Sequence, residues 1–262
     1  MRLNQLLKAL SLIVVASFIS RDAEAQSVAS RIANARDGKV RFTFAPKPGV
    51  CGSGNSISRN GNNRMNWSSN DNPDVTYDDE CSHSPVRVVM SVSGGKVTRL
   101  RTYVGGQWRT PAESTTDLGA LSTRDATNYL IEVAKSDDGR VGQEAILPLI
   151  LADSVNVYPA IAAIARDDSR PRSTKQQATF WLGQAAADVV APDREGKASE
   201  EDEIKKQAVF ALSQRRKEES VPFLIQVAKN NKNAEVRRSA LFWLGQTGDP
   251  RAVELFEQIL NR

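Results

Sequence analysis

Apolar residues recur at helical spacing through the second half of the chain, and the pattern is clearest over residues 234–260. Residues three or four apart lie on one face of a helix, so this spacing predicts amphipathic helices. Two helices are predicted here, separated by Gly248-Asp249-Pro250. Glycine commonly ends a helix and proline is tolerated in a first helical turn, so this tripeptide marks the boundary between them.

Similar stretches precede this one, and the alanines that align them are 33, 30 and 32 residues apart. The aligned residues are Ala145, Ala178, Ala208 and Ala240. A Phe-Trp-Leu-Gly-Gln string occurs twice, beginning at Phe180 and at Phe242. A regular period of this length is the signature of stacked two-helix repeats. Residues 122–262 are therefore predicted to form a helical repeat domain, with Ser122 capping its first helix.

The repeats differ in their second helices. Three of them are expected to carry proline in the first turn of that helix, at Pro159, Pro222 and Pro250. The second repeat is irregular, because residues 188–202 combine proline, glycine and charged residues. The sequence leaves open whether this stretch forms a degenerate helix or a long loop.

In the first half of the chain, apolar and polar residues alternate as they do in strands. Residues 39–44 have the alternation of a half-buried strand, and residues 86–110 are expected to form a three-stranded meander. A three-residue loop at residues 93–95 would place Val88 opposite Leu100 and keep the apolar side chains on one face. We expect a bulge-type turn there, with a glycine at positive φ.

A second turn, at Gly105-Gly106, would pair Tyr103 with Trp108. Together with Arg99 and Arg101, these two aromatic residues would occupy the face away from the aliphatic one. One interpretation is a surface for stacking or for binding an anion. The alternative is that this face packs under the loop between the two cysteines or is solvated, because aromatic pairs often support a sheet without binding a ligand.

The N-terminus has the features of an export signal. Arg2 and Lys8 accompany an apolar run too short to span a bilayer, and Ala23-Glu24-Ala25 fits a cleavage site. The sequence therefore predicts a signal peptide over residues 1–25. We expect a periplasmic or secreted protein with no integral membrane segment after cleavage.

An oxidising compartment favours a disulfide between the two cysteines of the chain, Cys51 and Cys81. On the chain-entropy model, closing this loop stabilises the fold by about 3–4 kcal/mol. The expected organisation is a small antiparallel β-rich domain over 26–110, a linker over 111–121 and the helical domain over 122–262. The fold class is thus α+β and multidomain.

The charge distribution argues against a nucleic-acid ligand. Residues 26–120 hold 12 Lys and Arg against 8 Asp and Glu, and residues 121–262 hold 20 against 21. A nucleic-acid-binding domain would carry a dense basic stripe, which neither half shows.

The sequence offers little for catalysis or for a metal. The single histidine, His83, lies beside Cys81, which is expected to be oxidised, and a zinc ligand set is missing. The acidic run over residues 71–80 lacks EF-hand spacing, so it is either a solvated turn or a calcium site. No glycine-rich loop leads into Gly-Lys-Ser/Thr. We therefore assign no catalytic residue, no metal ligand and no cofactor.

The last repeat resembles a known family. Its Glu-Val-Arg at 235–237, Ala240, Leu244-Gly245, Gly-Asp-Pro-Arg-Ala at 248–252 and Leu255 are similar to the HEAT-like repeat first associated with phycobilisome lyases. The resemblance covers about residues 140–262. It implies a right-handed helical solenoid with a concave recognition surface, in which Arg237 and Asp249 brace the turns between repeats.

We expect an exported protein-interaction or scaffold module, and the sequence favours a binding protein over an enzyme. Phe180 and Phe242 are candidate contact residues if they face the concave surface, and core residues otherwise. A protein partner is expected, but the sequence does not identify it. Two alternatives are a lyase-like enzyme, by analogy with bilin lyases that share the repeat, and a calcium-stabilised envelope protein.

Overall fold

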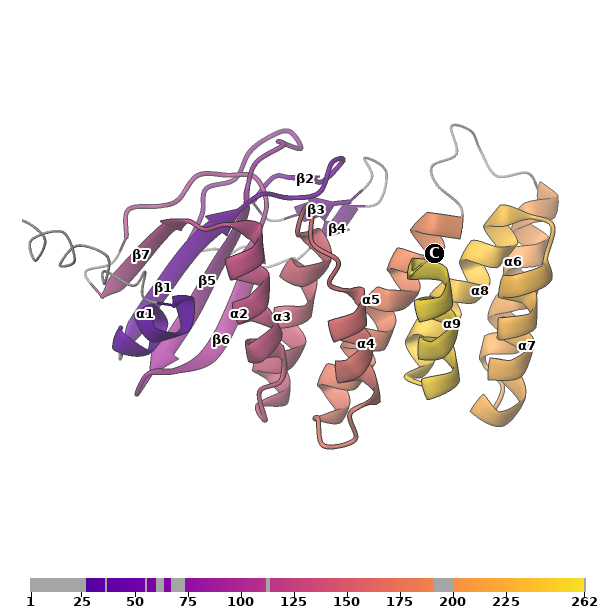
Figure 1. The fold of residues 1–262 in the computed structure, drawn as a ribbon. Helices are drawn as coiled ribbons and strands as arrows, with labels where there is room; N and C mark the ends of the chain where they lie inside the picture. The colour runs from indigo at the N-terminus through magenta and orange to yellow at the C-terminus, as the bar shows by residue number, and fades with distance from the viewer. Residues whose placement is uncertain are drawn as a thin grey trace, which may run out of the picture.

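The computed structural model describes residues 27–35, 37–54, 56–59, 64–66, 74–111, 114–190 and 200–261. The expected signal peptide lies outside these ranges, as does the middle of the irregular stretch at 188–202. A β-sheet region forms one end of the molecule, and a row of helices extends away from it (Figure 1).

The main sheet has four strands in the order β6-β5-β1-β7. They are β1 (Gly38–Phe44), β5 (Val86–Ser93), β6 (Lys96–Tyr103) and β7 (Thr115–Ala120). The alternation predicted for residues 39–44 is confirmed, because Val40, Phe42 and Phe44 are buried and the residues between them are not. The short helix α1 (Val28–Asn34) adds buried Ile32 to the same core.

Two expectations about this sheet are wrong. Residues 107–109 do not form a third meander strand, because Trp108 forms an isolated bridge to Val75 instead of pairing with Tyr103. The expected linker at 111–121 contains β7, which pairs with β1 in parallel and buries Leu118. Its polar composition suggested a linker, but threonine is β-branched and fits an edge strand well.

The turn between β5 and β6 was predicted in part. Gly94 and Gly95 form a two-residue turn at φ values of 56° and 74°. A bulge lies next to this turn, where Ser91 pairs with Arg99 and Val92 pairs with Val97. The prediction of a glycine at positive φ is confirmed, but the three-residue loop is wrong, because the bulge lies within the strand pair and not in the turn. Val88 accordingly lies opposite Thr102 instead of Leu100. The predicted pairing register of β5 and β6 is wrong by an even number of residues, so the apolar side chains still lie on the predicted face of the sheet.

A second, smaller sheet contains the disulfide. It comprises β2 (Cys51–Gly52), β3 (Ser56–Ser58) and β4 (Arg64–Asn66). Cys51 is bonded to Cys81 with an S–S distance of 2.03 Å, as predicted. His83 lies beside this bond, with its Nδ1 3.0 Å from the carbonyl oxygen of Val50, which gives the single histidine a structural role.

Eight helices follow within the described ranges: α2 (Thr123–Ala134), α3 (Gly139–Leu151), α4 (Tyr158–Arg166), α5 (Arg172–Val190), α6 (Glu200–Ser213), α7 (Lys217–Asn230), α8 (Ala234–Thr247) and α9 (Pro250–Leu260). Ser122 caps α2 as predicted, by accepting a hydrogen bond from the Asp125 amide. Pro159 and Pro250 lie in first turns, but Pro222 lies inside α7, which begins at Lys217.

The helices do not stack in sequence order. Figure 1 shows α8 and α9 between α5 and the outer pair α6–α7. Helices α5 and α8 are antiparallel, because Gly183 lies against Leu241 and Gly245 whereas Gln176 lies against Gly248. Two stacked copies of one repeat would instead place their first helices in parallel.

The irregular second repeat explains this reversal. Only nine residues, 191–199, separate α5 from α6, and in the described chain α6 follows α5 without an intervening second helix. Helices joined by short connections alternate in direction, so removing one helix inverts every later one. Regular stacking of the repeats would place Ala178, Ala208 and Ala240 in equivalent positions along one axis. This expectation is wrong, and Ala208 is exposed.

The sheet and the helices share one core. Buried residues form a continuous hydrophobic cluster from Phe42 and Leu100 in the sheet to Phe256 in α9. Helix α3 lies along the outer edge of β6, where Glu144 accepts a hydrogen bond of 2.7 Å from the Leu100 amide. This contact protects the edge strand and joins the two regions.

Candidate functional site

Two surfaces carry the residues that the sequence singled out. The first is the cationic face of the main sheet, which is defined by Lys39, Arg41, Arg87, Arg99 and Arg101. These residues alternate with the buried ones on β1, β5 and β6, so they point to the opposite side of the sheet. Tyr103 shares this face, as predicted.

Asp74 neutralises part of the cationic face. Its buried carboxylate pairs with Lys39, lies 3.4 Å from Arg101 Nη1 and accepts a 3.0 Å hydrogen bond from the Tyr103 hydroxyl. Burial raises the pKa of Tyr103, and the Asp74 carboxylate adds to the shift, so the phenol stays protonated. These residues thus fix the chain around Asp74 onto the sheet.

Trp108 stacks on arginines instead of on Tyr103. Its ring lies 4.9 Å from the Arg41 guanidinium carbon and 5.8 Å from that of Arg87. Arg41 also forms a 2.8 Å ion pair with Asp117 on β7. A pocket of about 230 Å³ remains beside these groups, with Lys39 and Arg109 among its lining residues. The chain's own carboxylates and aromatic ring therefore occupy much of the cationic face.

A second buried arginine joins the small sheet to the helices. Arg59, which follows β3, forms a 3.1 Å ion pair with Asp188 and lies over the Trp181 ring, 5.3 Å from its centre. Burial lowers the pKa of Arg59, and the Asp188 carboxylate opposes that shift. This contact could not be predicted from the sequence, because Arg59 and its partners are more than a hundred residues apart.

The second surface lies on the helices, where the two Phe-Trp strings meet. Phe180 on α5 and Phe242 on α8 approach edge to face, with ring centres 6.5 Å apart. Both rings are partly buried, whereas Trp181 is fully buried. Gly183 and Gly245 lie at the crossing and allow the two backbones to approach closely. The phenylalanines are thus brought together, and each supports the helix pair as well as reaching the surface.

A groove of about 510 Å³ opens beside Phe180 between α3, α5 and α8. We call it the glutamine groove. Its lining residues are Gln143, Ser173, Gln176, Gln177, Phe180, Gly245 and Gln246. Within the described ranges the four side-chain amides make no intramolecular hydrogen bond, so their donors and acceptors are available to a ligand.

The sequence contained a partial signal for this groove. Gln143 and Gln176 occupy equivalent repeat positions, and Gln246 ends the second Phe-Trp-Leu-Gly-Gln string. Their convergence could not be predicted, because it depends on α8 packing antiparallel to α5.

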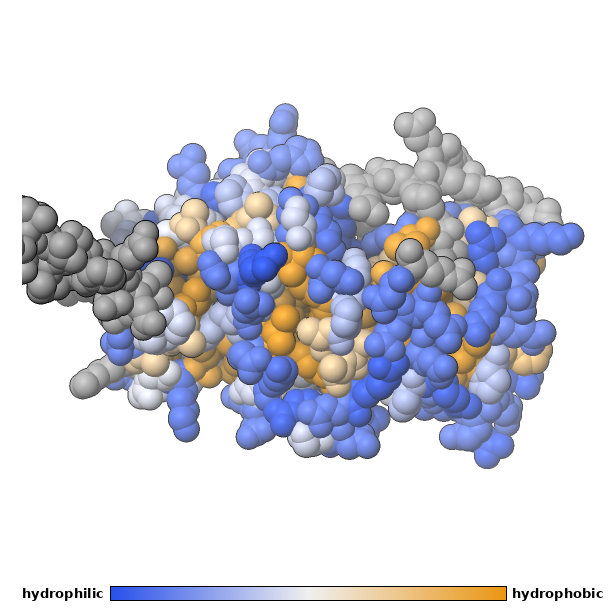
Figure 2. Space-filling view, in the orientation of Figure 1, coloured by the Kyte–Doolittle hydropathy of each residue, from blue (hydrophilic) through white to orange (hydrophobic). Residues whose placement is uncertain are grey.

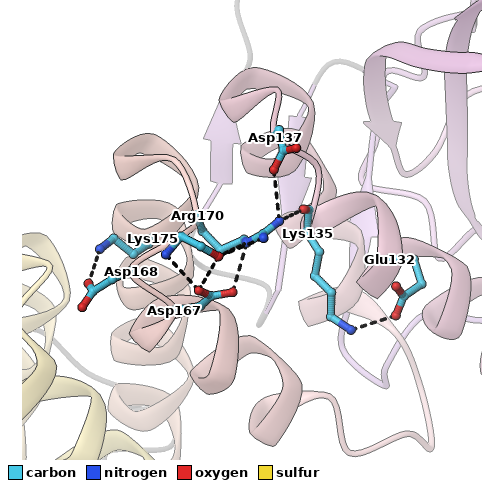
Figure 3. Close-up of polar contacts among 8 residues, drawn as sticks. Glu132, Lys135, Asp137, Asp167, Asp168, Arg170 and Lys175 are labelled. Atoms are coloured by element: carbon cyan, nitrogen blue, oxygen red, sulfur yellow. Dashed lines mark hydrogen bonds and ion pairs between the residues drawn. The ribbon is translucent and has the colours of Figure 1, made fainter.

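The turns at one end of the helical row are held by ion pairs. Figure 3 shows Arg170 between Asp167 and Asp137, with its guanidinium donating to the Lys135 carbonyl at the end of α2.

The bracing roles implied for Arg237 and Asp249 are also seen. Arg237 donates 2.8 Å and 3.0 Å hydrogen bonds to the carbonyls of Asn231 and Lys232, and Asp249 caps α9. Together with the contacts of Arg170, these hydrogen bonds hold the turns that lead into α3, α5, α8 and α9.

The described part of the acidic run is engaged in the fold. Asp74 serves the cationic face, and Asp78 accepts hydrogen bonds from the Gly106 amide and the Ser82 hydroxyl. Residues 71–73 lie outside the described ranges. Among the described residues, no group of three or more His, Cys, Asp or Glu side chains is arranged to hold a metal ion.

Comparison with known proteins identifies part of the chain. Residues 196–262, which contain α6 to α9, match the family model of HEAT repeats, whereas the sheet region has no family match. No curated protein and no solved structure shows a significant match. Each helix in the described ranges is too short or too polar to cross a bilayer. HEAT repeats are consistent with a helical module that interacts with other proteins.

Proposed function

We propose that this protein is an exported protein-interaction module and that the glutamine groove binds an extended polypeptide segment of its partner. The observation that carries the proposal is a cluster of amides that make no hydrogen bond to the described part of the chain, beside a partly exposed aromatic ring at the junction of three helices. The match to HEAT repeats supports a protein ligand.

The chemistry of the groove suits a peptide backbone. A glutamine amide both donates and accepts hydrogen bonds, as a peptide group does, so a row of glutamines can bind an extended chain of varied sequence. Phe180 provides an apolar contact for one side chain of the ligand. Figure 2 shows a further apolar area over α3 and α4, while the same face over α8 and α9 is mostly hydrophilic.

Peptide selection would test the groove. A displayed library of linear peptides is selected against the purified protein, and the recovered peptides are measured against variants. We expect Gln176→Ala and Gln246→Ala each to weaken binding about tenfold, the cost of removing one or two hydrogen bonds. Gln226→Ala changes an exposed glutamine on α7 and serves as the matched control.

Equal affinity of the selected peptides for the groove variants and the wild type would refute the groove as the binding site. Failure to recover any peptide from repeated selections would count against a linear peptide ligand altogether.

Export rests on the sequence features of residues 1–25 and is supported by the disulfide, because such bonds persist in oxidising compartments. Fractionation of the native host followed by N-terminal sequencing tests this part. We expect a mature chain that begins near Gln26. A chain recovered from the cytosol with residues 1–25 intact would exclude export.

A further inference from the structure

The pocket on the cationic face of the sheet is lined by more positive than negative groups. Its volume is about 230 Å³, and three of its lining residues are the cations Lys39, Arg41 and Arg109. Among its described lining residues, the only carboxylate is that of Asp74. Three cations against one carboxylate give this lining a net charge of +2. A cleft lined mainly by one sign of charge attracts ions of the opposite sign, so the pocket favours an anion.

Two carboxylates lie close to these cations, and each is already paired. Asp74 pairs with Lys39 and lies 3.4 Å from Arg101 Nη1. Asp117 forms its 2.8 Å ion pair with Arg41, but it does not line the pocket and its side chain is 42% exposed. Water screens an exposed carboxylate strongly, so Asp117 reduces the positive potential inside the pocket only in part.

Arg109 is the cation best placed to bind such an anion. It forms no ion pair with any carboxylate in the part of the chain that the structure describes. Its Nε donates a 3.1 Å hydrogen bond to the Val75 carbonyl, and its backbone amide donates one of 3.0 Å to the Asp74 carbonyl. These bonds orient the guanidinium and leave its two Nη groups for a ligand. A guanidinium can donate two parallel hydrogen bonds to one oxyanion, which adds both strength and specificity.

Other groups of the pocket are held in place around Arg109. The Arg41 side chain is 13% exposed, and its guanidinium carbon lies 4.9 Å from the centre of the Trp108 ring. Its Nη1 donates a 3.2 Å hydrogen bond to the Arg109 carbonyl. Burial strengthens the attraction of Arg41 for an anion, because less water screens the charge. Thr110 and Thr115 also line the pocket, and their hydroxyl groups can donate to the oxygen atoms of an anion.

The size of the pocket limits the anion. One water molecule takes about 30 Å³, so 230 Å³ corresponds to about seven or eight waters. That space holds one tetrahedral oxyanion with a few attached atoms. A phosphate group on a hydroxyl carries a charge of about −1.5 to −2 near neutral pH and has three strong acceptor oxygens. It therefore matches the pocket in charge, in size and in its need for hydrogen-bond donors.

We propose that this pocket binds a phosphate group, either as the free ion or as a small monoester. Arg109 and Arg41 donate hydrogen bonds to its oxygen atoms, and Lys39 adds to the positive potential while it stays paired with Asp74. The pocket lies on the sheet, whereas the glutamine groove lies between helices. Phosphate binding and peptide binding can therefore fail independently.

Isothermal titration calorimetry at low ionic strength tests the proposal with three probes: inorganic phosphate, glycerol 3-phosphate and succinate. We expect one phosphate group to bind per chain, and succinate, a dianion with planar carboxylates, to bind about tenfold more weakly or worse. Tighter binding of glycerol 3-phosphate than of inorganic phosphate identifies a monoester as the natural source, and the reverse or equal affinity identifies the free ion. The proposal is overturned if neither phosphate compound binds at about 10 mM, or if succinate binds equally well.

Two substitutions should move the affinity for phosphate in opposite directions. Arg109→Gln removes the cation that no described carboxylate pairs with, and it should weaken binding about tenfold or more. Asp117→Asn removes a negative charge beside Arg41 but keeps the Oδ1 atom that accepts the Gly119 amide, so it should strengthen binding several-fold. Arg124→Gln changes an exposed arginine on α2 and is the matched control, with unchanged affinity.

Damage to the fold cannot produce this pattern, because it would weaken binding in both variants. An Arg109→Gln protein that binds phosphate as well as the control does would place the ligand elsewhere and overturn the proposal. An Asp117→Asn protein that binds phosphate more weakly than the wild type, with an unchanged melting temperature, would contradict the charge argument on which it rests.

Discussion

The close crossing of α5 and α8 can be tested with one methyl group. A Cβ atom added at Gly183 would lie 2.8 Å from Gly245 Cα, 3.0 Å from the Leu241 carbonyl oxygen and 3.1 Å from the Phe256 ring. Two of these atoms belong to the backbone of a packed helix and cannot rotate away. The substitution Gly183→Ala must therefore move the helices apart.

The magnitude follows from two opposing effects. Overpacking a tight core contact costs about 1–3 kcal/mol. Alanine regains about 1 kcal/mol through its higher helix propensity. Because three contacts are too short at once, we expect the upper part of the range and a net loss of about 1–2 kcal/mol in the free energy of unfolding. For a chain of this size the melting temperature should fall by about 2–8 °C.

Urea unfolding followed by tryptophan fluorescence and circular dichroism measures this loss. Gly245→Ala is the graded comparison, because its Cβ would lie 3.2 Å from the Phe180 carbonyl oxygen and no closer to any other atom. It should stay within about 1 kcal/mol of the wild type. A Gly183→Ala protein that is as stable as the wild type, or more stable, would refute the close approach of α5 and α8 on which the groove depends.

Two further predictions concern the disulfide and a helix cap. Cys51→Ser should lower the free energy of unfolding by about 2–5 kcal/mol. Sheet and helices should still unfold in one transition, because they share a hydrophobic cluster, and two separate transitions would contradict that. Asp249→Ala removes the cap that accepts the Arg251 amide and should cost about 0.5–2 kcal/mol at neutral pH. The hydrogen bond from Arg251 lowers the pKa of Asp249, so its stabilisation is present above the ordinary carboxyl pKa and is lost as the pH falls through the lowered one. The stability difference between variant and wild type should therefore shrink in acid, and a difference that stays constant would exclude this role.

Local features were predictable wherever their cause was local. The strand at 39–44, the positive-φ glycines at 94–95, the Ser122 cap and the Cys51–Cys81 bond all follow from neighbouring residues or from a single pair. Both Phe-Trp strings lie on helices, and the one that begins at Phe242 falls within the residues that match HEAT repeats. In contrast, β7 was missed because its polar composition is also that of a linker.

The candidate site was predicted in composition but not in arrangement. Tyr103 and Trp108 both make contacts on the sheet, but not with each other. Tyr103 donates a hydrogen bond to Asp74, and Arg41 stacks on Trp108. Neither partner is near in sequence, and the Arg59 contact with α5 has the same character. Long-range ion pairs of this kind depend on which segments the fold brings together.

The sequence by itself determined that this protein has a disulfide-bonded β region followed by amphipathic helices with a HEAT-like repeat. Hydrophobic spacing, turn residues and caps are local properties, so they specify elements without their partners. Only the tertiary structure decided that α8 packs between α5 and α6 and creates the glutamine groove. The physical reason is that each short connection reverses the direction of the next helix. The absence of one helix therefore reverses every helix after it and changes which helix faces can meet.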